Sequence, residues 1–219
     1  MALLQGIEAV TFDVGGTLIE PWPSVGHVYA EVAARHGVKA PDVATLNRQF
    51  AAAWKGKGEF DYSKDSWFAL VAKTFGTQLE TLPPGFLEDL YAHFGEPVAW
   101  RVRDDVVPAF DELASLGLDL GVISNWDERL RPLLHKLKLT SFLNSITISC
   151  DIGFTKPSPV IFEQALKDLG APPQSVLHVG DNHREDVEGA TGAGLHAVRL
   201  DREGKGDVKS LKEIAALLD

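Results

Sequence analysis

The sequence predicts an α/β protein whose doubly wound parallel sheet is interrupted, after its first strand, by an all-helical insertion. The second half of the chain alternates short apolar runs with amphipathic segments of helical length. Strands separated by such helices pair in parallel and carry helices on both faces of the sheet. Between Leu18 and about Arg103, by contrast, apolar residues recur only at helical spacing. The 219 residues suffice for one substantial domain plus an insertion.

The first predicted strand lies in the stretch from Ile7 to Leu18, which reads IEAVTFDVGGTL. An apolar run ends abruptly at Asp13 and is followed by two glycines and Thr17. A buried strand that ends in a carboxylate and then turns on glycine is a common way for an α/β sheet to present a reactive group. We therefore expect Asp13 at the carboxyl edge of the sheet.

The insertion is predicted to span residues 20–103, and residues 1–19 and 104–219 are predicted to form the sheet domain. Four segments of the insertion have helical periodicity and end in glycine: 25–37, 42–56, 66–76 and 85–95. No strand is expected between Leu18 and Arg103.

The rest of the sheet domain is predicted from the alternation of strands and helices. The further strands are expected at 118–124, 145–149, 175–179 and 195–200. One helix is expected to begin after Asp127 as N-cap, and another to run from residue 160 to a stop at Gly170. Two more are expected to start at Glu185 and to span 209–219.

Composition narrows the possible partners. The chain carries 31 acidic and 21 basic residues, a net charge of -10, which disfavours nucleic acid and anionic membranes because both require a basic surface. The single cysteine, Cys150, is expected to be buried and permits no disulfide within the chain. Because no signal-peptide pattern or membrane-length apolar run is seen, we expect a cytoplasmic monomer or dimer with a small-molecule ligand.

Three later segments resemble the stretch around Asp13, because each of them also contains polar residues that could take part in catalysis. LGVISN contains Ser124, FTKPSP contains Lys156, and VLHVGDNHRED contains Asp181 and Asp186. Asp13 is the candidate nucleophile, because a carboxylate can accept a phosphoryl group and form an aspartyl-phosphate. Phosphoryl transfer depends on positioning and charge neutralisation, so cations and hydrogen-bond donors are expected around it.

The phosphate and metal ligands are assigned from these segments. Phosphate binding is expected from Thr17, which also fixes the turn, from Ser124, from Asn125 through its amide, and from Lys156, which also has a catalytic role. One Mg²⁺ is expected between Asp13, Asp181 and the backbone carbonyl of Gly15, with Asp186 holding a metal-bound water.

Each of these residues alone has a simpler explanation. A lone aspartate after a strand is usually a turn or capping residue, and a lysine before proline is usually on the surface. The combination is more specific, since four segments in chain order each supply a different group that the chemistry requires.

The four segments resemble the motifs of the haloacid dehalogenase (HAD) superfamily, in order and spacing, over essentially the full length. ISNWDERL, KPSPVIF and LHVGDNHREDVEGATGAG are most similar to the subfamily related to rhythmically expressed gene 2 protein and haloacid dehalogenase-like hydrolase domain-containing protein 3. The resemblance implies a Rossmann-like core, a mobile C1-type cap and a Mg²⁺-dependent hydrolase. It also implies Asp13 as nucleophile, with Ser124 and Lys156 as phosphate ligands. Asp181 and Asp186 would lie on the magnesium side.

One position departs from that pattern. Phosphatases of the superfamily usually carry Asp-x-Asp, whereas this chain has Asp13-Val14-Gly15. The absent aspartate would protonate the leaving alcohol and then activate water, assistance worth about 10²–10⁴-fold. Three outcomes stay open: substrates with good leaving groups, a substitute from the cap or from His183 or Asp127, or loss of turnover with retained ligand binding.

The function expected first is a phosphatase acting on a small phosphorylated metabolite. A catalytically impaired phosphate-binding or regulatory protein is the alternative that Gly15 suggests. A 2-haloacid dehalogenase is a weaker one. Such enzymes need no acid at that position, but they usually dispense with magnesium, whereas GDNHRED resembles a metal-retaining motif.

Overall fold

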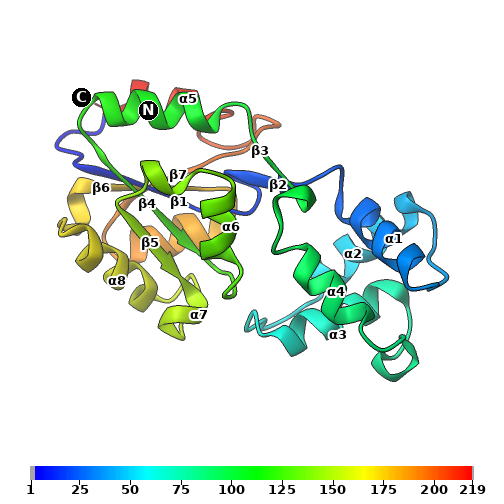
Figure 1. Cartoon of the computed structure of the whole chain (residues 1–219). Helices are drawn as coiled ribbons and strands as arrows, with labels where there is room; N and C mark the ends of the chain where they lie inside the picture. The colour runs from blue at the N-terminus through cyan, green and yellow to red at the C-terminus, as the bar shows by residue number, and fades with distance from the viewer. Residues whose placement is uncertain (1–2, 219) are drawn as a thin grey trace. The chain divides into compact units, whose positions relative to one another are not determined.

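The computed structural model describes residues 3–218, and one of its two compact units is built on a five-stranded parallel sheet (Figure 1). The strands are β1 (Ala9–Phe12), β4 (Asp119–Ser124), β5 (Ser145–Ile148), β6 (Val176–Gly180) and β7 (His196–Arg199). Their order across the sheet is β5-β4-β1-β6-β7, and all neighbouring strands are parallel. The predicted α/β fold with a parallel, helix-flanked sheet is therefore confirmed.

Helices cover both faces of this sheet. They are α5 (Val106–Ser115), α6 (Leu130–Lys136), α7 (Ser149–Ile152), α8 (Pro159–Leu169) and α9 (Gly189–Gly192), with a π-helical segment η5 (His183–Glu188) before α9. Ala9 belongs to one buried cluster with Phe162 of α8. The ring of Phe12 lies 5.1 Å from that of Phe110 of α5. Because residues 9 and 12 of a strand point to opposite faces, α8 and α5 pack on opposite sides.

Local sequence signals set the bounds of α8. Ser158 caps its first turn by accepting a hydrogen bond from the main-chain N–H of Val160, and Pro159 occupies the first helical position. Gly170 ends the helix with φ +68°, a left-handed conformation that glycine adopts without a steric penalty. The stop predicted at Gly170 is confirmed.

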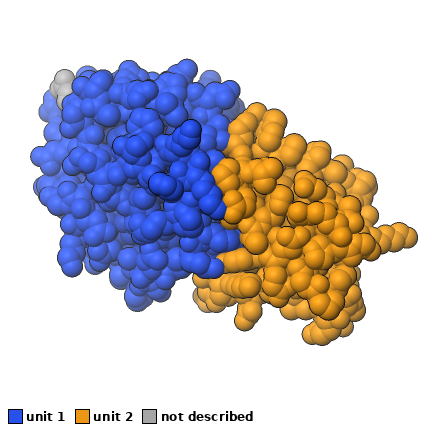
Figure 2. All heavy atoms as spheres, viewed as in Figure 1, with its two compact units in different colours: residues 1–19, 102–219 blue, residues 20–101 orange. Residues whose placement is uncertain are grey.

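Residues 20–101 form a second compact unit, separate from the unit made by residues 1–19 and 102–219 (Figure 2). Its helices are α1 (Val25–Arg35), α2 (Val43–Lys55), α3 (Lys64–Phe75) and α4 (Phe86–His93). Ser24, Asp42 and Ser63 cap the first three through side-chain oxygens. The four helices predicted in this stretch are present, and their apolar faces form a core of their own.

Two short strands in this part of the chain were not expected. Strands β2 (Ile19–Pro21) and β3 (Trp100–Val102) form a two-stranded sheet. The prediction of no strand between Leu18 and Arg103 is therefore wrong. Each strand has only three residues, too few to show a two-residue alternation.

Three other local predictions also need correction. The helix expected over 209–219 is replaced, up to residue 218, by two 3₁₀ turns, η6 (Leu211–Glu213) and η7 (Ala215–Leu217); Asp219 lies outside the described residues. The main-chain N–H of Leu211 donates to Asp105, and this tertiary contact overrides the helical pattern. Helix α6 starts only at Leu130: Oδ1 of Asp127 accepts from the Arg129 main-chain N–H at 3.1 Å, but residues 128 and 129 form a turn before the helix begins. Cys150 is exposed, since it lies in α7 rather than in a strand.

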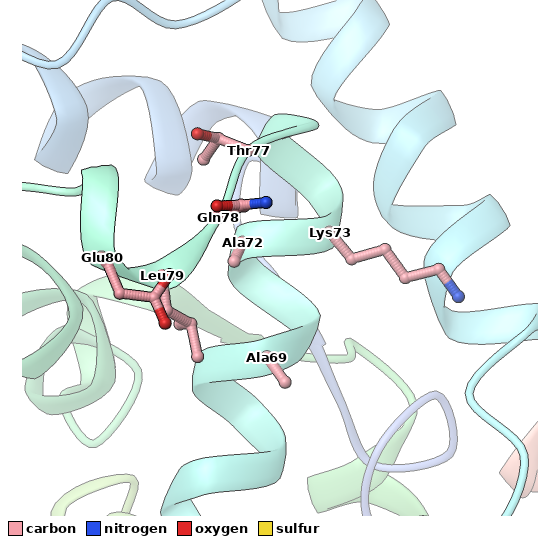
Figure 3. A pocket seen from close by; sticks show the side chains of 7 residues that line it. All are labelled: Ala69, Ala72, Lys73, Thr77, Gln78, Leu79 and Glu80. Atoms are coloured by element: carbon pink, nitrogen blue, oxygen red, sulfur yellow. The ribbon is translucent and has the colours of Figure 1, made fainter.

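The remaining short helical turns are η1 (Leu79–Thr81), η2 (Pro97–Ala99), η3 (Thr140–Phe142) and η4 (Pro173–Ser175). A shallow hollow beside α3 is lined by Ala69, Ala72, Lys73, Thr77, Gln78, Leu79 and Glu80 (Figure 3). It contains none of the candidate site residues. Among residues 3–218, the helices lack the length and apolar character needed to cross a membrane.

Candidate active site

The candidate residues lie where neighbouring strands of the parallel sheet end. Asp13 directly follows β1, Ser124 is the last residue of β4, and Asp181 directly follows β6. Because β1 pairs with both β4 and β6, these strand ends are adjacent. The hydroxyl of Ser124 donates to Oδ1 of Asp13 at 3.3 Å. The sheet thus presents the groups at its carboxyl edge, as in other open α/β sheets.

Lys156 provides the cation of this cluster, with its side chain only 1% exposed. Its Nζ donates to Oδ1 of Asp13 at 2.8 Å, to Oδ1 of Asp186 at 2.6 Å and to the carbonyl oxygen of Ile123 at 2.7 Å. These contacts use all three donors of an ammonium. Burial alone would lower the pKa of Lys156, but the two carboxylates raise it above its ordinary value, so Lys156 is charged.

Asn125 holds the main chain of Lys156 in place. Its Oδ1 accepts from the Lys156 main-chain N–H at 2.6 Å, and its Nδ2 donates to the Lys156 carbonyl oxygen at 3.0 Å. Nδ2 also donates to Glu185 at 3.2 Å. The carboxamide of Asn125 is therefore engaged within the protein. Its predicted contact with phosphate, through the main-chain amide, stays a prediction.

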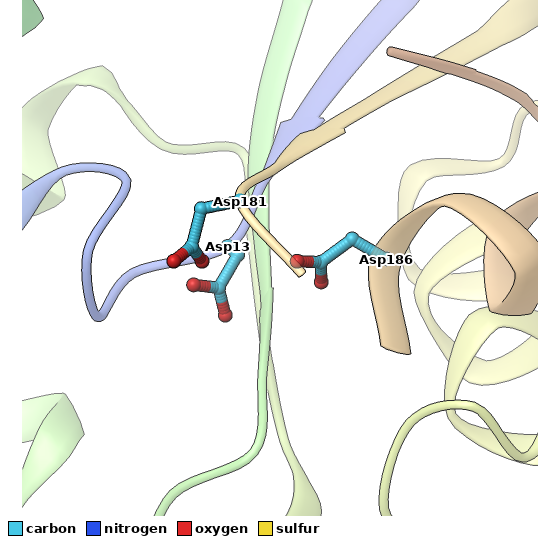
Figure 4. Close-up of side chains that lie close together, drawn as sticks. All are labelled: Asp13, Asp181 and Asp186. Atoms are coloured by element: carbon cyan, nitrogen blue, oxygen red, sulfur yellow. The ribbon is translucent and has the colours of Figure 1, made fainter. Parts of the chain in front are cut away.

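Three aspartates form the acidic part of the cluster (Figure 4). One oxygen from each of Asp13, Asp181 and Asp186 lies within 4.8 Å of the others. Desolvation and the charges of Asp13 and Asp186 raise the pKa of Asp181 to about 7. Burial also raises the pKa of Asp13, although Lys156 opposes the shift. Three carboxyl groups outnumber the one lysine of the cluster, and their crowding adds to burial in raising the pKa values of Asp13 and Asp181.

Asp186 differs from the other two aspartates because its oxygens are already bound. Besides Lys156, Oδ1 contacts Nε2 of His178 at 3.3 Å, and Oδ2 accepts from the main-chain N–H of Asn182 at 2.9 Å. Burial would raise its pKa, but Lys156 and His178 outweigh that effect and lower it. Asp13 and Asp181 thus have more ligand capacity left for a cation.

Two glycines permit this close packing. Gly16 has φ +89°, and a Cβ there would lie 2.8 Å from Oδ2 of Asp181. A Cβ on Gly180 would lie 2.2 Å from the Asp186 carboxyl group. A side chain at either position would therefore require the neighbouring aspartate to shift, and at Gly16 it would also have to adopt a positive φ.

His178 is a site neighbour that sequence reasoning missed. It is fully buried in β6, where Nδ1 lies 2.9 Å from the hydroxyl of Thr11 and Nε2 faces Asp186. Desolvation lowers its pKa, so the imidazole is neutral and donates from Nε2 to the carboxylate. The available signal was a histidine inside the otherwise apolar run VLHV.

Thr17 does not present its hydroxyl to a ligand in this structure. The residue is fully buried, and among the described residues its Oγ1 has no hydrogen-bond partner. Its carbonyl oxygen accepts from Arg202 at 3.1 Å. A role in fixing the turn agrees with this burial better than direct contact with phosphate.

Gly15 lies beneath an aromatic ring. A Cβ at position 15 would be 3.1 Å from Cζ3 of Trp126, closer than about nine in ten Cβ contacts in proteins, so the indole would have to shift by a few tenths of an ångström. The left-handed residue of this turn is Gly16, not Gly15. The backbone of Gly15 would therefore accept a side chain, whereas the space beyond it is taken by the indole.

The two residues considered as replacement acids are both engaged elsewhere. Asp127 has a side chain 2% exposed and accepts from Nε and Nη2 of Arg129 at 2.7 and 2.6 Å. His183 is well exposed and lies 3.5 Å from Glu188.

Comparison with known proteins identifies the family. The sequence pattern of haloacid dehalogenase-like hydrolases matches residues 7–194. The chain therefore belongs to this family of hydrolases, as its motifs predicted.

Several relatives extend this result. The chain is 34% identical to haloacid dehalogenase-like hydrolase domain-containing protein 3 of Danio rerio, covering 89% of this chain and 85% of that protein. It is 29% identical to rhythmically expressed gene 2 protein of Drosophila melanogaster, covering 90% and 84%. It is also 29% identical to glyceraldehyde 3-phosphate phosphatase of Methanopyrus kandleri, covering 91% and 85%.

Solved structures share the fold. The HAD hydrolase YfnB of Bacillus subtilis, in a magnesium-bound crystal form, has a TM-score of 0.77 at 17% identity, covering 100% of this chain and 99% of that one. At this level of identity the likeness extends to the fold alone.

Proposed function

We propose that this chain is a Mg²⁺-dependent phosphatase that hydrolyses a small phosphorylated metabolite through an aspartyl-phosphate on Asp13. The observation that carries the proposal is the environment of one carboxylate oxygen. Oδ1 of Asp13 contacts both the Lys156 ammonium and the Ser124 hydroxyl, next to Asp181 and Asp186. The hydrolase family and a relative named as a phosphatase support this reading.

The residues around Asp13 have separate tasks in this mechanism. Asp13 attacks phosphorus with one carboxylate oxygen, so it must be ionised and correctly directed. Lys156 and Ser124 bind that carboxylate, and each would transfer its hydrogen bond from Asp13 to a phosphoryl oxygen that approaches it. Asn125 keeps the Lys156 main chain in position.

The donor set fits magnesium. It consists of carboxyl oxygens, which are hard ligands, and three carboxyl groups outnumber the one neighbouring lysine. Asp13 and Asp181 would hold the ion, with the carbonyl of Gly15 as a third ligand and Asp186 acting through a bound water. Bound Mg²⁺ would neutralise the charge that accumulates between the phosphoryl group and the carboxylates.

The test is Mg²⁺-dependent phosphate release from 4-nitrophenyl phosphate. Turnover should vanish in Asp13→Asn and persist in Asp168→Asn, a matched change at an exposed aspartate of α8. Equal residual rates in wild type and Asp13→Asn would overturn the proposal. We also expect the protein to work as a cytoplasmic monomer or dimer on a small molecule.

A second candidate function is favoured by Gly15, which removes the usual proton donor. A binding or regulatory protein would take up beryllofluoride with Mg²⁺ yet show no turnover on any phosphate ester. A dehalogenase would instead release halide from a 2-haloacid without added metal, which the acidic cluster disfavours.

A further inference from the structure

The space above Gly15 is filled by a residue from a different strand end. Cζ3 of Trp126 would lie 3.1 Å from a Cβ at position 15, and Cη2 and Cε3 would lie 3.8 and 4.0 Å from it. The indole thus covers the direction in which any side chain would leave the backbone there. Position 15, two residues after Asp13, therefore lacks a side chain, and Trp126 packs over the space that a side chain would enter.

Hydrogen bonds fix the main chain of Trp126, and its side chain is largely buried. The main-chain N–H of Trp126 donates to Oγ of Ser149 at 3.0 Å, and that hydroxyl donates back to the Trp126 carbonyl oxygen at 3.0 Å. The N–H of Cys150 donates to the same carbonyl at 3.2 Å. Trp126 itself is 9% exposed. A carboxylate at position 15 would have to displace a packed aromatic residue.

We propose that Gly15 and Trp126 together determine specificity: Gly15 supplies no proton donor, and Trp126 packs where a side chain at position 15 would go. The pair confines the enzyme to phosphoryl groups on acidic leaving groups: aryl, enol and acyl phosphates rather than alkyl phosphates. This inference rests on the proposed phosphatase function. Its physical reason is that the indole occupies the place of a protonating side chain and cannot itself supply a proton to an alkoxide.

The bond changes of the reaction show why the leaving group matters. The Asp13 oxygen bonds to phosphorus while the bond from phosphorus to the leaving oxygen breaks, and its electron pair stays on that oxygen. In a loose transition state this oxygen carries nearly a full negative charge. A phenolate, enolate or carboxylate can depart in this form and take its proton from water afterwards. An alkoxide cannot depart readily without a proton donor.

The second step is hydrolysis of the aspartyl-phosphate, which returns Asp13 to its starting state. Water attacks phosphorus, the bond to the Asp13 oxygen breaks, and its electron pair returns to the carboxylate. The proton of the water passes to the product phosphate or to solvent. The sum is a phosphate ester plus water giving phosphate and the protonated leaving group.

The experiment is a double-mutant cycle of Gly15→Asp and Trp126→Ala. The rate constant kcat/KM is measured with Mg²⁺ for 4-nitrophenyl, phenyl and ethyl phosphate. The wild type should show a steep fall in kcat/KM along this series. Relative to Trp126→Ala, the double variant should gain about 10²-fold on phenyl phosphate and much less on 4-nitrophenyl phosphate. The matched control is Gly15→Asn with Trp126→Ala, which has the shape of aspartate without its proton and should show no gain.

Stability tests the steric part independently of turnover. Gly15→Asp alone should lower the Tm more than the same change made in Trp126→Ala. If Gly15→Asp fails to fold, Gly15→Ala adds only the Cβ and should show the same coupling. Additive Tm shifts would overturn the proposal, because the indole would then not exclude a side chain at position 15.

The possible results distinguish a failure of this inference from a failure of the proposed phosphatase function on which it rests. Turnover that depends on Asp13 but is equally fast on ethyl and 4-nitrophenyl phosphate overturns the leaving-group assignment and leaves the phosphatase function standing. Equal gains from Gly15→Asp and Gly15→Asn in the Trp126→Ala background do the same. Absence of any turnover that Asp13→Asn removes overturns the phosphatase function, and the leaving-group assignment with it.

Discussion

The ammonium of Lys156 lies closer to Asp186, at 2.6 Å, than to Asp13, at 2.8 Å. One buried cation thus joins the candidate nucleophile to the carboxylate that His178 and the Asn182 main chain hold from the other side. This link couples the end of β1 to the segment that follows β6.

Removal of the Lys156 charge should impair both activity and stability. Lys156→Met leaves two buried carboxylates without their cation, and breaking such a pair costs about 3–5 kcal/mol. Urea unfolding should show this loss, and Asp186→Asn in the same chain should recover part of it. Lys167→Met, at an exposed position of α8, is the control and should change neither property. A Lys156→Met protein as stable and active as wild type would contradict the role given to this cation.

Magnesium should stabilise the folded protein through Asp181. Binding to the folded state alone adds about 2.7 kcal/mol when the Mg²⁺ concentration is 100 times Kd. The Tm should therefore rise with Mg²⁺ and fall again with a chelator. Asp181→Asn should abolish this response, and Asp168→Asn should retain it. A response unchanged in Asp181→Asn would place the ion elsewhere.

Asp105 lies outside the candidate site, and its contacts predict a pH-dependent contribution to the stability of the protein. It is bound by Nη1 of Arg202 at 2.7 Å, and by Ser210 and the Leu211 N–H at 2.9 Å each. Burial would raise its pKa, but these contacts lower it. A depressed pKa gives stability that is present above the ordinary pKa near 3.8 and is lost as the pH falls through the folded-state value.

The measurement compares wild type with Asp105→Asn across pH. At pH 7 the variant should be less stable by about 2 kcal/mol, because it loses charge-assisted hydrogen bonds. The difference should shrink as the pH falls below about 4, where Asp105 of the unfolded wild-type chain takes up a proton, and should be smallest below the lowered folded-state pKa. A constant difference down to low pH would show that the charge of Asp105 contributes nothing.

The sheet and the identity of the acidic cluster could be predicted from the sequence for a clear physical reason. Parallel strands buried on both faces are continuous apolar runs, and their carboxyl ends meet at one edge. Asp13 and Ser124 therefore had to be close once β1 and β4 were recognised as neighbours. Helix caps such as Ser63 and stops such as Gly170 are equally local signals.

The features that could not be predicted from the sequence depend on contacts between residues that are distant in the chain. The packing of Trp126 over Gly15 and the position of His178 behind Asp186 join residues far apart or hidden inside an apolar pattern. Burial of Thr17 could not be read from a turn motif. The contact between Leu211 and Asp105 likewise overrides a helical pattern at the end of the chain.

The central claim is that Asp13 becomes phosphorylated, and trapping this species tests it most directly. Wild type mixed with 4-nitrophenyl phosphate and Mg²⁺ is quenched in acid, and its peptides are weighed by mass spectrometry. Because Gly15 supplies no base for the hydrolytic water, the phosphoenzyme should accumulate. We expect one phosphoryl group on the peptide that contains Asp13, absent in Asp13→Asn. A phosphoryl group on another residue, or turnover with none on Asp13, would contradict the account.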